Sequence, residues 1–250
     1  MDVIRFSYPN LPQGDGHKIT LAMGNFDGMH RGHIALLLRA SYEASDVSSA
    51  LFLEPPFQKE FARLTSLEDK IRYAPQGRID RVYALQTSDA FYALSPDDFI
   101  EGILKPLGVA QVVVGADFRF GKGAEGDIDL LRRHFRVIVP EFVRFEGDKI
   151  GSRGIREALS RGDIASANEG LGHPYEVALS LKEKRGDNEL QLEKTFDYAL
   201  PKSGEYRGIA YILGLPFEGT LNTDSLLLSL SAGSSARPMA PGSTVYFTFV

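Results

Sequence analysis

Two histidines in the segment GNFDGMHRGH (residues 24–33) are the side chains best suited to chemistry on a charged substrate. His30 and His33 are three residues apart, so they share a face if a helix begins near Arg31. Imidazole groups in that arrangement can donate hydrogen bonds to phosphate oxygens and stabilise the negative charge of a transition state. The spacing alone does not indicate a metal, because a metal site needs further ligands and the sequence points to none.

This segment joins an apolar run that favours a strand, Ile19–Met23, to one that favours a helix, Ile34–Leu38. Ligands of parallel α/β sheets bind beyond the carboxyl ends of the strands. Gly24 and Gly28 allow the backbone to approach a ligand closely. The first turn of the helix would present N–H groups and a positive dipole end to phosphate. We therefore predict a phosphate-binding turn, with a purely structural use of the glycines and histidines as the alternative.

Short apolar runs alternate with helical patterns from residue 19 to residue 172, which is typical of a parallel sheet covered by helices. The strands expected in this part are Ile19–Met23, Ala50–Leu53, Arg81–Leu85, Gln111–Val114 and Arg136–Val139. Those expected after it are Val177–Leu181, Leu190–Phe196, Gly208–Leu213, Ser225–Leu230 and Val245–Val250. We predict an α/β chain of two domains: a parallel-sheet domain over residues 1–173 and a small antiparallel β-barrel or sandwich over residues 174–250.

Residues that cap helices indicate where the helices begin. The expected N-terminal caps are Thr65, Ser95, Asp127, Ser152 and Asp163. Thr65 and Glu68 have the spacing of a capping box, in which each side chain bonds the other's free backbone N–H. Ser152 is expected to cap a short helix over Arg153–Ser160.

The composition excludes several classes of protein. The 250 residues include no cysteine, which rules out disulfides, cysteine nucleophiles and thiolate metal sites. A formal net charge of -5 argues against a nucleic-acid-binding surface or a polybasic membrane anchor, but it allows a phosphorylated small molecule. Met1–Arg5 lacks the features of a secretory signal, and no apolar run approaches the roughly 20 residues of a membrane span. We expect a cytoplasmic protein that binds neither nucleic acid nor membrane.

Two segments, GNFDGMHRGH (24–33) and VVVGADFRFGKGAEGDIDLL (112–131), resemble the signatures of a known family. The family is the FAD synthetase module of bacterial bifunctional riboflavin kinase/FAD synthetases, within the nucleotidyltransferase superfamily. The resemblance covers residues 17–175 and implies a Rossmann-like nucleotidyltransferase fold for the first domain. It also implies transfer of AMP from ATP to FMN, which gives FAD and pyrophosphate with Mg²⁺.

The resemblance implies roles for individual residues. The residues that would assist the transfer are His30, His33 and Arg156. Those that would bind the phosphates of ATP are Gly24, Asn25, Phe26, Asp27, Gly28 and Ser152. Those that would place FMN or the nucleotide are Pro55, Pro56 and Asp117. No side chain is assigned as a metal ligand, and Asn25 and Asp27 can instead organise the turn itself.

The expected phosphate-binding turn KIGSRGIREAL (149–159) departs from the family pattern. Gly151 stands where a serine is usual, and Arg153 stands where a threonine is usual. A lost hydroxyl donor costs about 0.5–1.5 kcal/mol, and more when its partner is a charged phosphate. Arg153 can compensate for that loss or can block the turn.

The last part of the chain departs further. Between Lys184 and Pro201 there is no Gly-Phe-Pro-Thr-Ala-Asn type motif, which a riboflavin kinase would carry. We therefore predict a degenerate riboflavin kinase-like β domain over residues 174–250, without kinase activity. Two alternatives to FAD synthesis stay open: nucleotidyl transfer to another phosphorylated acceptor, and a catalytically weakened homologue that binds nucleotide or flavin.

Overall fold

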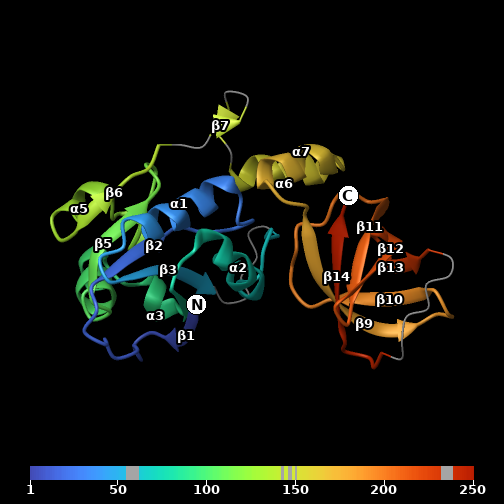
Figure 1. The fold of residues 1–250 in the computed structure, drawn as a ribbon, viewed down its shortest axis with the longest axis horizontal. Helices are drawn as coiled ribbons and strands as arrows, with labels where there is room; N and C mark the ends of the chain where they lie inside the picture. The colour runs from blue at the N-terminus through green and yellow to red at the C-terminus, as the bar shows by residue number, and fades with distance from the viewer. Residues whose placement is uncertain (55–61, 142–143, 146–147, 150, 232–238) are drawn as a thin grey trace. The chain divides into compact units, whose positions relative to one another are not determined.

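The computed structural model describes residues 1–54, 62–141, 144–145, 148–149, 151–231 and 239–250. The chain divides into two compact units, one formed by Met1–Glu60 and Ser66–Lys149 and the other by Phe61–Thr65 and Ile150–Val250. Figure 1 shows the strands of the first unit in blue to yellow and those of the second in orange to red. No helix in the described ranges is long and apolar enough to cross a membrane.

A six-stranded parallel sheet forms the centre of the first unit, in the order β1-β4-β3-β2-β5-β6. Its strands are β1 (Asp2–Ser7), β2 (Ile19–Met23), β3 (Val47–Glu54), β4 (Arg81–Gln86), β5 (Val109–Val114) and β6 (Arg136–Ile138). The helices are α1 (Arg31–Tyr42), α2 (Leu67–Tyr73), η1 (Ala74–Gly77), α3 (Asp89–Tyr92), α4 (Pro96–Phe99), η2 (Ile100–Leu104), η3 (Lys122–Ala124) and α5 (Ile128–Arg132). A short antiparallel pair, β7 (Arg144–Phe145) and β8 (Asp148–Lys149), follows.

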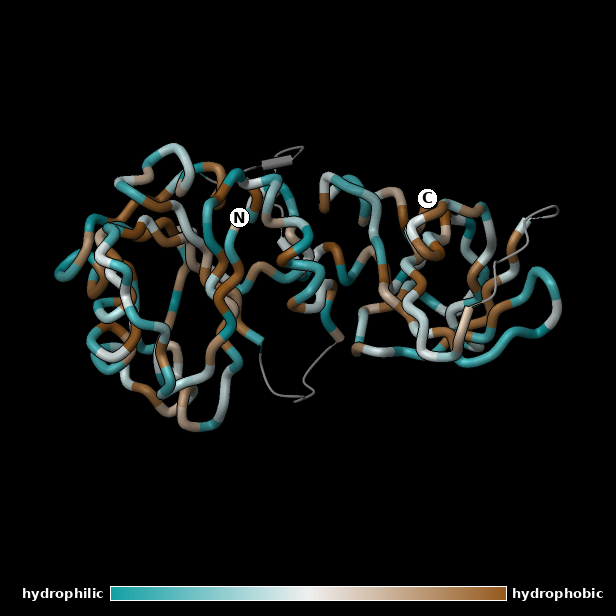
Figure 2. Tube along the Cα trace, turned by 60° about the horizontal axis from the view of Figure 1, so that its bottom comes forward, coloured by the Kyte–Doolittle hydropathy of each residue, from teal (hydrophilic) through white to brown (hydrophobic). Residues whose placement is uncertain are grey.

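The central strands are buried on both faces, as their continuous apolar runs predict. In β2, Ile19, Leu21 and Met23 belong to one hydrophobic cluster, which includes residues of α3, η2 and α5. Ala22 points the other way, into a cluster with residues of α1 and α2. Figure 2 shows apolar colouring along much of these strands. The expected Rossmann-like class of this unit is confirmed, with helices packed on both sides of a parallel sheet.

All five strands predicted for this sheet are present, within a few residues of their expected bounds. β1 was not expected. It lies at the edge of the sheet, where it pairs only with β4, and Val3 and Arg5 on it are exposed. A half-exposed edge strand lacks the continuous apolar run that identifies a central one.

Two predicted helix caps are displaced by one residue. α2 is capped by Ser66, whose hydroxyl accepts from the Asp69 N–H at 3.1 Å while the Asp69 carboxylate accepts from the Ser66 N–H at 2.9 Å. The capping box predicted for Thr65 and Glu68 is therefore wrong: Thr65 is buried and precedes the cap. The caps at Ser95, Asp127 and Asp163 are confirmed.

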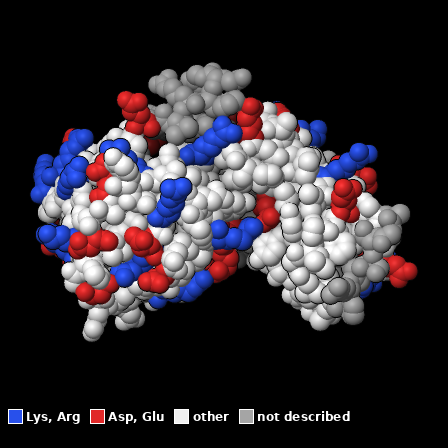
Figure 3. Space-filling model, in the orientation of Figure 1, with Lys and Arg blue, Asp and Glu red and all other residues white. Residues whose placement is uncertain are grey.

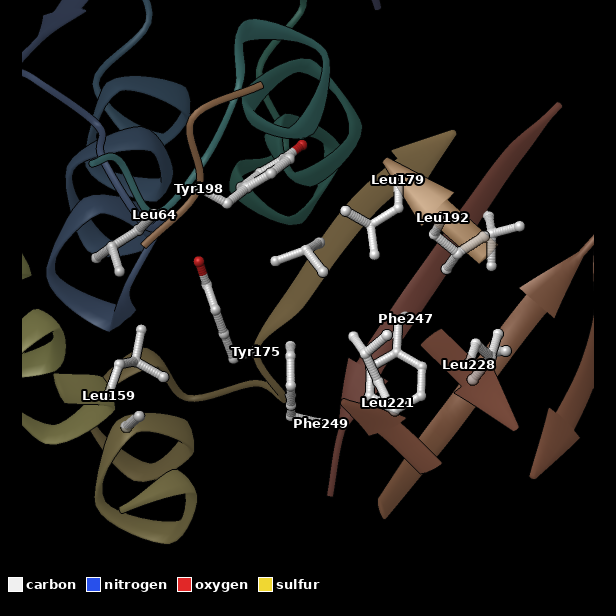
Figure 4. Packing of buried hydrophobic residues seen from close by; sticks show 14 of the residues in the cluster. Leu64, Leu159, Tyr175, Leu179, Leu192, Tyr198, Leu221, Leu228, Phe247 and Phe249 are labelled. Carbon is white, nitrogen blue, oxygen red and sulfur yellow. The ribbon is translucent and has the colours of Figure 1, made fainter. Parts of the chain in front are cut away.

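The second unit contains a closed antiparallel barrel of six strands in the order β10-β13-β12-β11-β14-β9. The strands are β9 (Glu176–Lys184), β10 (Glu189–Lys194), β11 (Glu205–Ile212), β12 (Leu215–Asn222), β13 (Leu227–Leu230) and β14 (Thr244–Phe249). Figure 4 shows its apolar interior, where Tyr175 stacks on Phe249 with ring centroids 5.7 Å apart. The antiparallel domain was expected, and closure pairs every strand on both sides.

β12 was not expected because it contains Pro216 and Gly219, which weaken a strand pattern. Pro216 lies at the end of β12 that pairs only with β11, so its missing N–H interrupts no second ladder. Gly219 is required by close approach, since a Cβ there would lie 2.7 Å from the Ser229 carbonyl oxygen. The sequence pattern therefore failed where tertiary packing permits both residues.

Two helices, α6 (Ser152–Arg161) and α7 (Ile164–Leu171), group with the barrel. Ile155, Leu159 and Leu171 on these helices belong to the same hydrophobic cluster as the barrel strands. The sequence places a change of character near residue 173, whereas the compact units divide at residues 149 and 150. Periodicity distinguishes helices from strands, but only packing decides which core a helix joins.

Candidate functional site

The strand order makes the end of β2 a topological switch point, where the chain stops adding strands on one side of β2 and starts adding them on the other. From β2 the chain proceeds to β3 and β4 on one side and then to β5 on the other side of β2. Met23 and Val114, the last residues of β2 and β5, are paired in register. The loops that leave these two strands therefore begin side by side, which is where open α/β sheets bind ligands. One loop is the 24–30 turn, and the other carries Asp117.

The 24–30 turn has an uncommon backbone. Phe26, Gly28 and Met29 have φ angles of 53°, 88° and 43°. The left-handed conformation suits Gly28, but it costs a residue with a side chain about 1–2 kcal/mol. Phe26 and Met29 are both completely buried in the core beneath α1, and the Met29 N–H donates to the Phe26 carbonyl at 3.3 Å. Burial of these two side chains stabilises a turn that its backbone alone would not favour, and such strain is characteristic of functional sites.

The other residues of the turn differ in exposure. Asn25 is exposed, Gly24 is partly exposed, and Asp27 is buried at 3%. A Cβ on Gly24 would lie 3.6 Å from the Phe26 ring, an ordinary contact, so packing within the chain does not require glycine there. The burial of Asp27 supports the alternative in which this carboxylate organises the turn.

The two histidines lie together at the start of α1, as their spacing predicts. His30 is the N-terminal cap of the helix, and its Nδ1 accepts from the His33 N–H at 3.4 Å. The two rings stack with centroids 3.7 Å apart at an angle of 18°. A Cβ on Gly32 would lie 3.2 Å from two atoms of the His30 ring, so the glycine leaves room for this arrangement. Because Nδ1 of neutral His30 is an acceptor, its proton is on Nε2, which is therefore a donor.

Burial lowers the pKa of His33 well below its ordinary value, and the neighbouring charges of His30 and Lys70 lower it further. His33 is half-buried, and its Nδ1 has no hydrogen-bond partner among the described residues. The ring also contacts Phe26, with centroids 5.2 Å apart. His33 is therefore a neutral imidazole near neutral pH, and the stacked pair avoids having two positive charges.

Lys70 of α2 contacts the 24–30 turn, although it was not among the predicted candidate residues. Its side chain is 3% exposed, and Nζ donates to the backbone carbonyl of Asn25 at 3.0 Å. The sequence contains one signal that points to it. Leu67, Lys70, Ile71 and Ala74 have the i, i+3, i+4, i+7 spacing of a buried helix face, so Lys70 is a charge on an apolar stripe.

Ser152 and Arg156 lie in the second unit, on α6. The N-terminal cap of this helix is Gly151, so the expectation that Ser152 is the cap is wrong by one position. Glycine has no side chain to bond the first N–H groups of α6, and a bound anion can do so instead. Ser152 and Arg156 are half-buried and four residues apart, which places them on one face of the helix.

Of the candidate residues for placing FMN or the nucleotide, the structure describes Asp117. Asp117 is exposed in the loop after β5, within a turn in which the Phe118 N–H donates to the Gly115 carbonyl at 3.0 Å. Pro55 and Pro56 lie outside the described residues. Among the residues that the structure does describe, no group of three or more His, Asp and Glu side chains could hold a metal ion.

Comparison with known proteins connects these features to one family. The family model described as FAD synthetase matches residues 13–153. The bifunctional riboflavin kinase/FMN adenylyltransferase of Escherichia coli (strain K12) is 33% identical over 248 residues, which is 93% of this chain and 78% of that protein. The Listeria monocytogenes protein of the same name is 31% identical over 206 residues, 74% of this chain and 66% of its own length.

A solved structure shares the fold. It is described as "Crystal Structure of Macrolide-efflux Protein from Streptococcus pneumoniae", with a TM-score of 0.83 and 19% sequence identity. The match covers 100% of this chain and 90% of that one. At this identity the likeness concerns the fold alone.

Proposed function

The chain belongs to the FAD synthetase family, and from that premise we propose that it transfers the adenylyl group of ATP to FMN. The observation that supports this proposal best is the stacked pair of His30 and His33 at the start of α1. The pair follows a strained turn at the carboxyl end of β2, where an α/β sheet binds its ligand. Donors at that place suit a polyphosphate.

In the proposed reaction, a phosphate oxygen of FMN attacks the α-phosphorus of ATP in line with the bond to the β-phosphate. A new P–O bond joins FMN to AMP, the bond between the α-phosphorus and the bridging oxygen breaks, and pyrophosphate leaves with that electron pair. No covalent enzyme intermediate is needed. The protein has to align the two substrates and stabilise the charge that develops on the phosphate oxygens.

The histidines supply hydrogen bonds in this mechanism. The Nε2–H of His30 donates to a phosphate oxygen of ATP, because its Nδ1 is already an acceptor for the His33 N–H. Burial lowers the pKa of His33, and the neighbouring His30 and Lys70 lower it further. The ring is therefore uncharged and acts as a neutral donor. The N-terminal end of α1 adds its dipole to both.

The remaining family positions have supporting roles in this proposal. The backbone of Gly24, Asn25, Phe26, Asp27 and Gly28 lines the triphosphate, and Gly28 allows close approach. Ser152 and Arg156 contact phosphate oxygens, the guanidinium in a bidentate manner. Asp117, Pro55 and Pro56 place FMN or the nucleotide.

Magnesium enters as part of the substrate, MgATP. The described residues include no cluster of three carboxylate or imidazole groups that would form a protein cage. Mg²⁺ commonly keeps several waters and binds through substrate phosphates. We further propose that the barrel has no riboflavin kinase activity, because the motif for it is absent between Lys184 and Pro201. The proposed location is the cytoplasm.

The proposed function is tested by incubating the purified protein with ATP, Mg²⁺ and FMN and separating FMN from FAD by chromatography. FAD and pyrophosphate are expected in equal amounts. Riboflavin in place of FMN is expected to give no FMN. Formation of no FAD, with turnover of another phosphorylated acceptor or with nucleotide binding alone, would replace the proposal by one of the two alternatives.

Substitution of the histidines tests the site. His30→Ala and His33→Ala are each expected to lower kcat by roughly 10²–10³, the effect of losing one donor to a developing oxyanion. His17→Ala is the matched control, because His17 is exposed. Circular dichroism should show that all three variants are folded. Full FAD formation by both site variants would contradict the assignment.

A further inference from the structure

The lysine on α2 is a buried charge with a defined neighbour. Lys70 is 3% exposed, and lysines are almost never buried unless they are paired. Burial of an ammonium group carries a large desolvation cost, which its hydrogen bonds and other interactions have to offset. Its Nζ donates to the carbonyl of Asn25, 45 positions earlier in the chain, at 3.0 Å. A charge retained at this cost beside a candidate phosphate site suggests a use in that site.

The bond to Asn25 acts on the backbone of the turn. Asn25 directly precedes Phe26, the first of the residues with a left-handed backbone, and Asn25 itself is exposed. The Lys70 ammonium therefore fixes the carbonyl of an exposed residue at the entry to the strained segment. The burial of Phe26 and Met29 fixes the rest of the segment.

The same ammonium group acts on the histidine pair. The charged or titratable groups that act on His33 are His30 at the cap of α1 and Lys70 of α2, which follows the buried Asp69. The Asp69 carboxylate already accepts from Ser66 and binds Arg72 at 3.2 Å. Lys70 lowers the pKa of His33, so its positive charge is felt at the imidazole.

We propose that Lys70 is a positioning residue of the adenylyl-transfer site, which fixes the turn through the Asn25 carbonyl and provides a positive charge near His33. The inference rests on the proposed function, since it assigns a further residue to the same site. A fixed charge in a water-poor site stabilises phosphate oxygens without reorganisation during the reaction. It also favours the neutral form of His33, so that this ring can donate in a fixed direction.

The test compares two variants of α2. Lys70→Met removes the ammonium group and keeps a side chain of similar length. Arg72→Met is the matched control, because it removes a positive charge from the same helix, where the Arg72 side chain is 41% exposed and lies over the Tyr73 ring at 5.1 Å. NMR titration of the histidine signals in the three proteins follows His33, assigned with a His33→Gln variant. FAD formation is measured on the same samples, per folded molecule.

Lys70→Met is expected to raise the midpoint of the His33 titration and to lower kcat roughly 10- to 100-fold, the scale of a small misplacement in an active site. Arg72→Met is expected to change neither. A merely structural lysine would lower the amount of folded protein and leave both quantities unchanged in the molecules that fold. An unshifted His33 titration together with a kcat equal to that of Arg72→Met would overturn the proposal.

A second route applies if Lys70→Met does not fold. The chain has no cysteine, so Lys70→Cys carries the only thiol. Alkylation with 2-bromoethylamine in denaturant, followed by refolding, restores an ammonium group at nearly the original length, whereas iodoacetamide adds a neutral amide. Wild type taken through the same steps is the reference. Recovery of kcat with the first reagent alone supports the proposal, and equal kcat after both reagents contradicts it.

The two proposals fail in different ways. If wild type forms no FAD, the proposed function fails. The His33 titration in Lys70→Met still decides whether Lys70 acts on the histidine pair. If wild type forms FAD and Lys70→Met behaves like Arg72→Met, the function stands and the role of Lys70 fails.

Discussion

At the scale of single residues, some properties of His30 and His33 depend on residues close in sequence, and others depend on residues far away in sequence. The His30 cap and the stacked rings depend on residues within three positions of one another. The low pKa of His33 depends on burial and on Lys70 of α2, which lies far along the chain. Spacing therefore predicts the pair, whereas its charge state follows from the fold.

This charge state has a consequence for stability. In the unfolded chain His33 takes up a proton near pH 6.5, whereas in the folded chain it does so only at lower pH. Between these two values the unfolded state binds more protons, so the free energy of unfolding falls as the pH falls. We expect urea unfolding at about pH 7.5, 6 and 5 to show a steeper loss of stability for wild type than for His33→Gln.

The matched control for this experiment is His17→Gln, since His17 is exposed. It should retain the wild-type slope with pH. Equal slopes for wild type and His33→Gln would show that the burial of His33 does not couple to folding.

At the scale of elements, the capping residues show how a local pattern can be right in kind and displaced in position. The chain offers both Thr65–Glu68 and Ser66–Asp69 as capping boxes, and the fold uses the second. In this register both Thr65 and Lys70 are buried. A displacement of one residue rotates a helix by about 100°, so the tertiary contacts choose among local alternatives.

Substitutions in α2 distinguish the two registers. Ser66→Ala removes the cap and is expected to lower the free energy of unfolding by about 0.5–2 kcal/mol. Glu68→Ala breaks only an exposed ion pair with Arg5, for which about 0–1 kcal/mol is expected. Chemical denaturation measures both. A larger loss for Glu68→Ala would indicate that the earlier capping box forms in solution.

At the scale of the whole chain, two cores of different kinds are present. The first unit has helices on both faces of a sheet, and the second has a closed barrel with two helices and the segment from Phe61 to Thr65. In this segment, Leu64 is completely buried in the barrel cluster, and the Arg63 N–H donates to the Asp197 carbonyl at 2.9 Å. A short part of the connection between β3 and α2 thus belongs to the barrel unit.

The distribution of charged side chains on the surface (Figure 3) is consistent with the modest formal net charge of -5. On the face drawn in Figure 3, basic and acidic side chains are interspersed over each unit. A surface of mixed charge is typical of proteins that stay in solution by themselves. Affinity for a phosphorylated ligand must then come from a local arrangement of donors.

The barrel contains a position that only glycine can occupy. A Cβ on Gly208 of β11 would lie 2.2 Å from the Thr248 carbonyl oxygen and 2.5 Å from Cζ of Phe247. Gly208→Ala is therefore expected to lower the free energy of unfolding by about 1–3 kcal/mol or more. Gly154→Ala on α6 is the control, since a Cβ there meets no atom within 4 Å. Calorimetry measures both variants, and equal melting temperatures would contradict the close approach of β11 and β14.

By itself, the sequence determined what depends on neighbouring residues. The apolar pattern predicts β2 and the start of α1, and capping chemistry predicts most helix caps. The spacing of three residues predicts that His30 and His33 lie together. The change from a parallel α/β pattern to antiparallel strands also follows from local composition.

Only the tertiary structure decided what depends on residues far apart. It brought Lys70 to the 24–30 turn, assigned α6 and α7 to the barrel core, and permitted Pro216 and Gly219 within a strand. These outcomes depend on which surfaces pack together and on how closely two backbones approach. Neither can be predicted from a local sequence pattern.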